Sequence, residues 1–119
     1  PKVVSVKTEL AQSSVDGAYA TQYTIPTGGA GIYRITGNIG IRTKSSTSWL
    51  VEAAVNYGGI LNGSAELGAV NVNTGSSGVF SCITCYFHVG DAIQTGTFTI
   101  SGSNTGGVFD ACWVIERLA

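Results

Sequence analysis

The sequence contains three cysteines and one histidine, whose side chains can bind metal ions. Cys82, Cys85, His88 and Cys112 supply the number and types of ligand found in structural zinc sites. The spacing argues against such a site, because residues 82 and 85 of a straight strand point to opposite faces. The two residues between them, Ile83 and Thr84, are poor turn formers. We therefore expect buried free thiols and no metal or other cofactor.

The odd number of cysteines, three, also argues against a disulfide framework in a chain of 119 residues. Reduced thiols are typical of proteins that fold in the cytosol. The sequence begins at Pro1 without the apolar stretch of a secretory signal, and no apolar run reaches the ~18 residues of a membrane helix. We expect synthesis in a reducing cytoplasm and no membrane insertion.

Nucleophilic catalysis needs a base beside a nucleophile, and His88 is the single histidine. Asp91 follows it by three residues, but no Gly-x-Ser-x-Gly elbow is present. We expect no enzymatic activity, a core or interfacial role for His88, and a backbone-bonding turn role for Asp91. Asp110 and Glu116 lie on an apolar strand and are expected to pair with arginines, namely Arg34, Arg42 or Arg117.

The low charge excludes one class of partner. Only 11% of the residues are charged, and the formal net charge is −1. Phosphate backbones are bound by clustered positive charge, so we expect no nucleic-acid partner.

The remaining composition favours strands. Val, Ile and Thr number 35, against 15 for Leu, Glu, Lys, Gln and Met together. Polar, glycine-containing turns recur at the 8 to 12 residue spacing of a sandwich or jelly roll. We predict strands at Val3–Lys7, Ala18–Ile25, Ile32–Arg42, Trp49–Tyr57, Leu67–Val72, Val79–Val89, Ala92–Ser101 and Val108–Leu118.

Two of these strands, Val79–Val89 and Val108–Leu118, are apolar on both faces. A chain of 119 residues cannot normally enclose both faces of two strands, and exposed apolar surface usually marks an interface. The pattern therefore indicates an obligate homo-oligomer.

Short motifs resemble the jelly rolls typified by tumour necrosis factor and the complement globular head. Thr24-Ile25-Pro26 followed by Gly31 to Gly37 is similar to their "Ile-Pro … Gly-x-Tyr" segment, and Gly90-Asp91 to a turn between late strands. The ending, Phe109 to Leu118, resembles their apolar closing strand, and the overall form is closest to small versions in bacteriophage structural proteins.

The resemblance implies an antiparallel jelly-roll β-sandwich of about eight to ten strands that forms a homotrimer. Residues 1–18 would form an N-terminal arm and first strand, and residues 19–119 the jelly-roll domain. Residues carried over as lining the trimer interface are Tyr33, Phe80, Tyr86, His88, Trp113 and Ile115.

These expectations describe a non-enzymatic virion protein that cements the capsid exterior at threefold-type sites by binding the major capsid protein. Its capsid-contact arm would include Lys2, Val3, Val4 and Val6. The alternative is the receptor-binding head of a phage tail fibre or needle, which would bind a host glycan or surface protein through loops that contain Asn62, Asn73 and Asn104.

Overall fold

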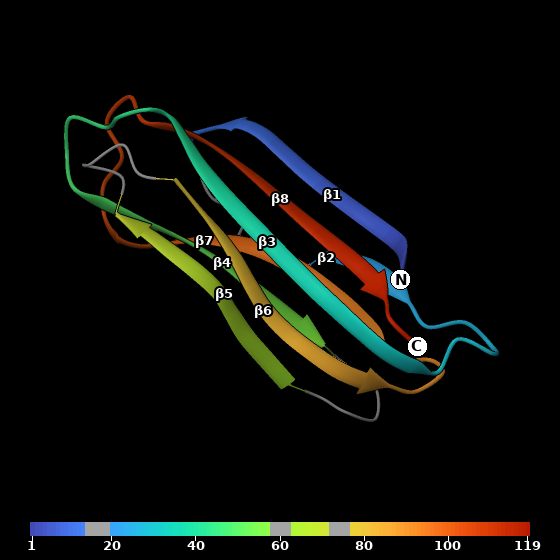
Figure 1. Ribbon diagram of the computed structural model, residues 1–119. Helices are drawn as coiled ribbons and strands as arrows, with labels where there is room; N and C mark the ends of the chain where they lie inside the picture. Colours follow the sequence, from blue (N-terminus) through green and yellow to red (C-terminus); the bar gives the residue numbers. More distant parts are fainter. Residues whose placement is uncertain (14–19, 58–62, 72–76) are drawn as a thin grey trace.

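Two antiparallel sheets packed face to face make up the chain, as an all-β sandwich (Figure 1). The computed structural model describes the backbone of residues 1–13, 20–57, 63–71 and 77–119. It describes their side chains except at residue 53 and in 63–71, 77–83 and 97–102. Within these ranges all eight predicted strands are present. They are β1 (Lys2–Gln12), β2 (Ala20–Thr24), β3 (Gly31–Thr43), β4 (Trp49–Tyr57), β5 (Gly63–Asn71), β6 (Ser77–Phe87), β7 (Ala92–Gly102) and β8 (Val108–Arg117).

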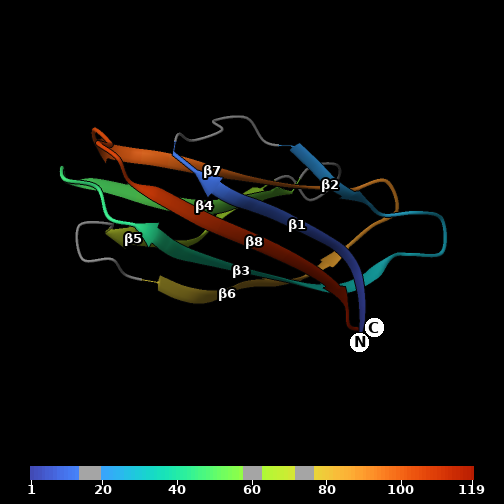
Figure 2. The same ribbon diagram turned by 90° about the horizontal axis from the view of Figure 1, so that it is seen from above.

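One sheet has the order β1-β8-β3-β6 and the other β2-β7-β4-β5, and every pairing is antiparallel. The molecule is elongated along its strands, with extents of 49 × 23 × 17 Å. The second view shows the two chain ends beside each other (Figure 2). This proximity follows from the pairing of Lys2 with Arg117 at the ends of β1 and β8.

Strict alternation of side chains in β3 and β8 builds the core. Tyr33, Ile35, Gly37 and Ile39 of β3 are buried, and the residues that alternate with them are half-buried or exposed. The buried residues of β8 alternate with half-buried ones in the same way. Both central strands therefore direct one face at the second sheet. The described core consists of Ile25, Tyr33, Ile35, Ile39, Trp49, Val51, Val55, Phe87, Ile93, Phe109, Ala111, Trp113 and Ile115.

A β-bulge in β6 interrupts the regular alternation of residues along that strand. Ile35 pairs with Ile83, but its neighbour Thr36 pairs with Ser81, so Cys82 is an extra residue in the ladder. An extra residue reverses the phase of the alternation between the two parts of the strand that it separates. Such a bulge depends on the partner strand and has no signature in the local pattern.

The N-terminal segment is a strand rather than a free arm. Lys2–Gln12 pairs with β8 along its length, with register shifts between Val3 and Ser5 and between Glu9 and Gln12. The edge position in the sheet explains why half of its side chains stay exposed.

The start of β3 lies against the last residues of the chain. Ile32 N donates to Ala119 O (2.9 Å), and Leu118 N donates to Ile32 O (2.7 Å). A Cβ at Gly31 would fall inside the contact distance of the Ala119 carbonyl oxygen, whereas one at Gly40 would meet no heavy atom within 4 Å.

We therefore expect Gly31→Ala to lower the free energy of unfolding by about 1–3 kcal/mol, because backbone must move to relieve the clash. Gly40→Ala, in the same strand, is the matched control and should be neutral or slightly stabilising. Denaturant unfolding of both variants measures the difference. Equal stability of the two would contradict the close approach.

Candidate functional site

The segments that carry the sequence resemblance meet at one end of the sandwich. Ile25 N donates to Asp91 O (3.0 Å), and Gly90 N donates to Ile25 O (2.8 Å). The buried Tyr33 hydroxyl donates to Gly29 O (2.5 Å), and its ring packs edge-on against Phe87. These bonds join the connection between β2 and β3 to the turn between β6 and β7. We call this end of the sandwich the corner, and its hydrogen bonds and ring contact hold the two connections together.

His88 and Asp91 form the turn that the sequence predicted. Asp91 is fully buried, and its Oδ2 accepts a hydrogen bond from His88 N at 2.8 Å. Asp91 N in turn donates to His88 O (3.2 Å). The carboxylate thus holds the backbone of its own turn. The His88 ring is half-buried and lies edge-on to Tyr86, with ring centroids 5.1 Å apart.

Burial raises the pKa of the Tyr33 hydroxyl above its ordinary 10.0. Tyr23 acts in the same direction, and the nearby Arg117 opposes it. The unfolded chain ionises this tyrosine near its ordinary pKa while the folded chain keeps it neutral, so stability is lost as the pH rises above that value.

Tyr33→Phe should lower the free energy of unfolding at neutral pH by about 1 kcal/mol through the lost hydrogen bond to Gly29. The deficit should narrow in alkali, because only the wild type then gains an ionised unfolded state. Denaturant titrations across the alkaline range measure the gap. A gap that widens with pH would contradict this account.

The thiols do not assemble into a metal site in the described part of the chain. No three His, Cys, Asp or Glu side chains come together there. Cys85 and Cys112 are free, as expected, and both are half-buried. The side chain of Cys82 lies outside the described residues.

The outward face of the β1-β8-β3-β6 sheet carries most of the large exposed apolar side chains in the described part of the chain. Val6 of β1 lies opposite Val114 of β8, which lies opposite Thr36 of β3. Cys112 lies between Thr8 and Asn38 in the next such row. We call this the outer face, and its large exposed apolar residues are Val3, Val6, Leu10, Ile32 and Tyr86.

Arginine–carboxylate pairs neutralise the charge on the outer face. Arg34 pairs with Glu116 at 3.2 Å and Arg42 with Asp110 at 3.0 Å, each across β3 and β8. This confirms the predicted partners of both carboxylates. Apolar residues and uncharged polar residues such as Thr8 and Asn38 therefore lie between charge pairs that cancel.

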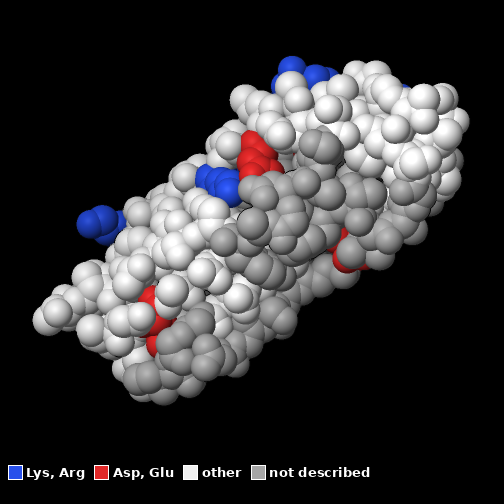
Figure 3. Space-filling model, turned by 180° about the vertical axis from the view of Figure 1, so that it is seen from behind, with Lys and Arg blue, Asp and Glu red and all other residues white. Residues whose placement is uncertain are grey.

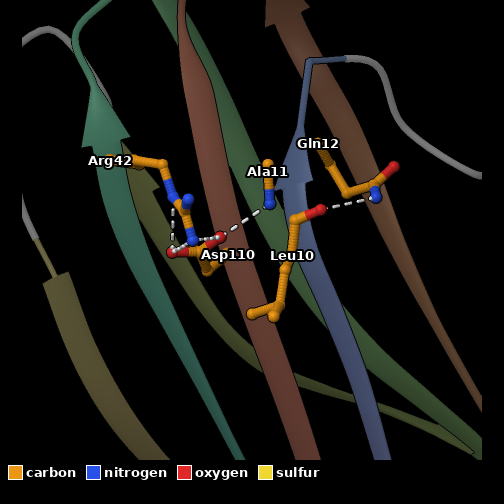
Figure 4. A network of polar contacts seen from close by, with 5 residues as sticks. All are labelled: Leu10, Ala11, Gln12, Arg42 and Asp110. Carbon is orange, nitrogen blue, oxygen red and sulfur yellow. Dashed lines mark hydrogen bonds and ion pairs between the residues drawn. The ribbon is translucent and has the colours of Figure 1, made fainter.

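Asp110 also reaches β1, so one carboxylate joins three strands (Figure 4). Its Oδ1 accepts a hydrogen bond from Ala11 N at 2.7 Å, and its Oδ2 accepts from the Arg42 guanidinium. Ala11 has a φ of 53° and lies in the second register shift of β1. The Ala11 bond, followed by Arg42, lowers the pKa of Asp110 below its ordinary 3.8 against the opposing effect of desolvation.

Because its folded-state pKa is depressed, Asp110 stabilises the fold above its ordinary pKa, and this contribution is lost as the pH falls through the folded-state value. Asp110→Asn should therefore be less stable than the wild type at neutral pH, with the gap closing in acid. Arg42→Gln should have the smaller effect, because the Ala11 bond remains. Acid titration of thermal melting measures this, and a constant gap would contradict it.

The residues carried over as trimer contacts fall into two groups. Tyr33, Trp113 and Ile115 are at most 1% exposed and pack inside the sandwich of one chain. Tyr86, 50% exposed, and the half-buried His88 lie at the end of β6, where Tyr86 is opposite Ile32. Phe80 is opposite Gly37, and its side chain lies outside the described residues. Tyr33, Trp113 and Ile115 are therefore enclosed within a single chain.

Of the predicted arm residues, Lys2 and Val3 are exposed and Val4 packs against the core. Val6 is 55% exposed on the outer face. All four belong to β1.

The loops of the alternative function are described at Asn104 only, because Asn62 and Asn73 lie outside the described residues. Asn104 Nδ2 donates to Ser13 O and Gly107 O, and its Oδ1 accepts from Gly107 N. Ser45 Oγ beside it accepts from Thr47 N and Thr105 N. These polar groups tie two loops and the end of β1 together.

The described surface has no concentration of charge on the side seen from behind, where acidic and basic groups form small separate spots (Figure 3). No helix of the length and apolarity needed to span a membrane occurs in the described part of the chain. No protein-family model matches the chain, and no curated protein matches it. The candidate site therefore rests on its own geometry.

Sequence reasoning missed the contact of Asp110 with the Ala11 backbone. A backbone donor has no sequence signature, and the contact depends on the bulge in β1. The outer face itself could be found from the alternation of β8, whose apolar residues occupy both faces.

Proposed function

We propose that this protein is a non-enzymatic virion component, a jelly-roll homotrimer that decorates the outside of a phage capsid. The observation that carries the proposal is the outer face, which exposes large apolar side chains and whose arginines and carboxylates are already paired. Paired charges cost less to bury than unpaired ones, and the exposed apolar side chains gain from burial, so such a face favours association with protein.

The sheet order supports the jelly roll. Among the described strands, every pair of sequence neighbours except β4 and β5 is divided between the two sheets, and β1 lies beside β8. Two four-stranded antiparallel sheets with these crossing connections are typical of a jelly roll. The virion assignment comes from the resemblance of the corner and closing-strand motifs to phage structural jelly rolls.

The trimer is tested by native mass from light scattering over a dilution series. We expect species built from three chains, and Val114→Glu, in the middle of the outer face, should dissociate them into folded monomers. Thr24→Glu, at an exposed position of the other sheet, is the matched control and should leave the trimer intact. A wild type without such species, or a trimer unaffected by Val114→Glu, would contradict the proposed contact.

Capsid decoration is tested separately by cosedimentation with phage heads, in parallel with binding to intact bacteria. Pelleting with heads supports decoration. Binding to cells alone would replace it with the receptor-binding head of a tail fibre or needle.

A further inference from the structure

The edge of β1 offers backbone hydrogen-bonding groups over a long strand. In the part of the chain that the structure describes, β8 is its single strand neighbour, and β1 ends the order of its sheet. Exposed edges of this kind pair readily with a strand from another chain unless they are protected. The residues of β1 determine which strand can pair with this edge.

The order of residues in β1 is complementary to itself when the strand is reversed. We propose that two copies of the chain join their β1 edges antiparallel about a twofold axis at Thr8. In this register Val6 lies opposite Leu10 of the other copy, and Lys7 lies opposite Glu9. The twofold axis makes each of these contacts twice. Opposite charges and apolar pairs placed directly across antiparallel strands stabilise the pairing.

Neighbouring registers are penalised. A twofold axis at Lys7 would bring two lysines face to face, and an axis at Glu9 two glutamates. Side chains alternate between the two faces of the sheet. The paired strands can therefore shift only in steps that keep outward residues opposite outward residues and inward residues opposite inward residues. The charge order therefore selects the axis at Thr8 over both neighbours.

The side chains already lie where this pairing needs them. Val6 and Leu10 are 55% and 58% exposed, so their contact would cover apolar surface. Lys7 and Glu9 form an ion pair at 3.3 Å with side chains only 17% and 15% exposed. Pairing extends this ion pair to four alternating charges at a partly covered site, where attraction is screened less than at an open surface.

The register shifts of β1 limit the length of the contact. Ser5 to Glu9 pairs with β8 without interruption, and the shifts flank it on both sides. Bulges and inward-facing charges protect many edges against unrelated strands. Here they leave a short segment whose charge order fits a second copy, so the association should be selective and reversible. This pairing depends on the backbone edge of β1, whereas the proposed trimer contact centres on Val114 in the middle of the outer face; Val6 and Leu10 belong to both surfaces.

The test exchanges charge at the axis. Thr8 is exposed and would lie opposite its own copy, so Thr8→Asp and Thr8→Lys should each weaken self-association, by roughly tenfold, while an equimolar mixture of the two restores it. Sedimentation velocity over a dilution series should show a wild-type species with twice the mass of either variant alone. Neither substitution breaks the Lys7–Glu9 pair within the chain.

Lys7→Glu mixed with Glu9→Lys gives a second test that reports the register, because each residue 7 then meets an opposite charge at residue 9. Thr24→Asp with Thr24→Lys, on the edge strand of the other sheet, is the matched control and should change nothing. A wild type whose mass never doubles, or Thr8 variants that associate as the wild type does, would overturn the pairing. Failure of trimer formation with doubling intact would contradict the proposed function alone.

Discussion

The adjacency of β3 and β8 in the middle of one sheet is the constraint on which the rest of the molecule depends. Each buries one row of side chains against the second sheet, so the core exists because these two strands keep an unbroken register from Tyr33 opposite Arg117 to Ile41 opposite Phe109. Their outward rows are then fixed as well. Each arginine–carboxylate pair joins one strand to the other, and the apolar outer face fills the space between them.

The register between β3 and β8 therefore determines both which residues enter the core and which lie on the outer face. A one-residue slip between β3 and β8 would send Trp113 and Ile115 outward and bring Glu116 and Val114 into the core. The backbone bonds of Ile32 to Leu118 and Ala119 and the three-strand contacts of Asp110 oppose such a slip from opposite ends of β3. The two polar anchors thus fix the alignment of strands whose stability comes from burial.

Strand positions could be predicted from the sequence because alternation and turn residues are local signals. The predicted limits of β4 match the structure, and those of β3 differ by one residue at each end. The bulge at Cys82 could not be predicted, since it depends on the match between β6 and β3. Alternation assigned apolar residues to two faces of β8 but could not decide which face packs inside the chain, and so Trp113 was expected at an interface although it lies in the core. The self-complementary order of β1 was visible in the sequence, but it gained meaning only when β1 proved to be an edge strand.

The paired charges of the outer face have a consequence for how an assembly would respond to its solution. Association through a surface whose ions are already neutralised within each chain depends on apolar hydration, which weakens on cooling and is little affected by dilute salt. Contact through the edge of β1 would draw on attraction between lysine and glutamate, which added salt screens. Cooling would therefore weaken the contact through the outer face, and added salt would weaken the pairing of the β1 edges.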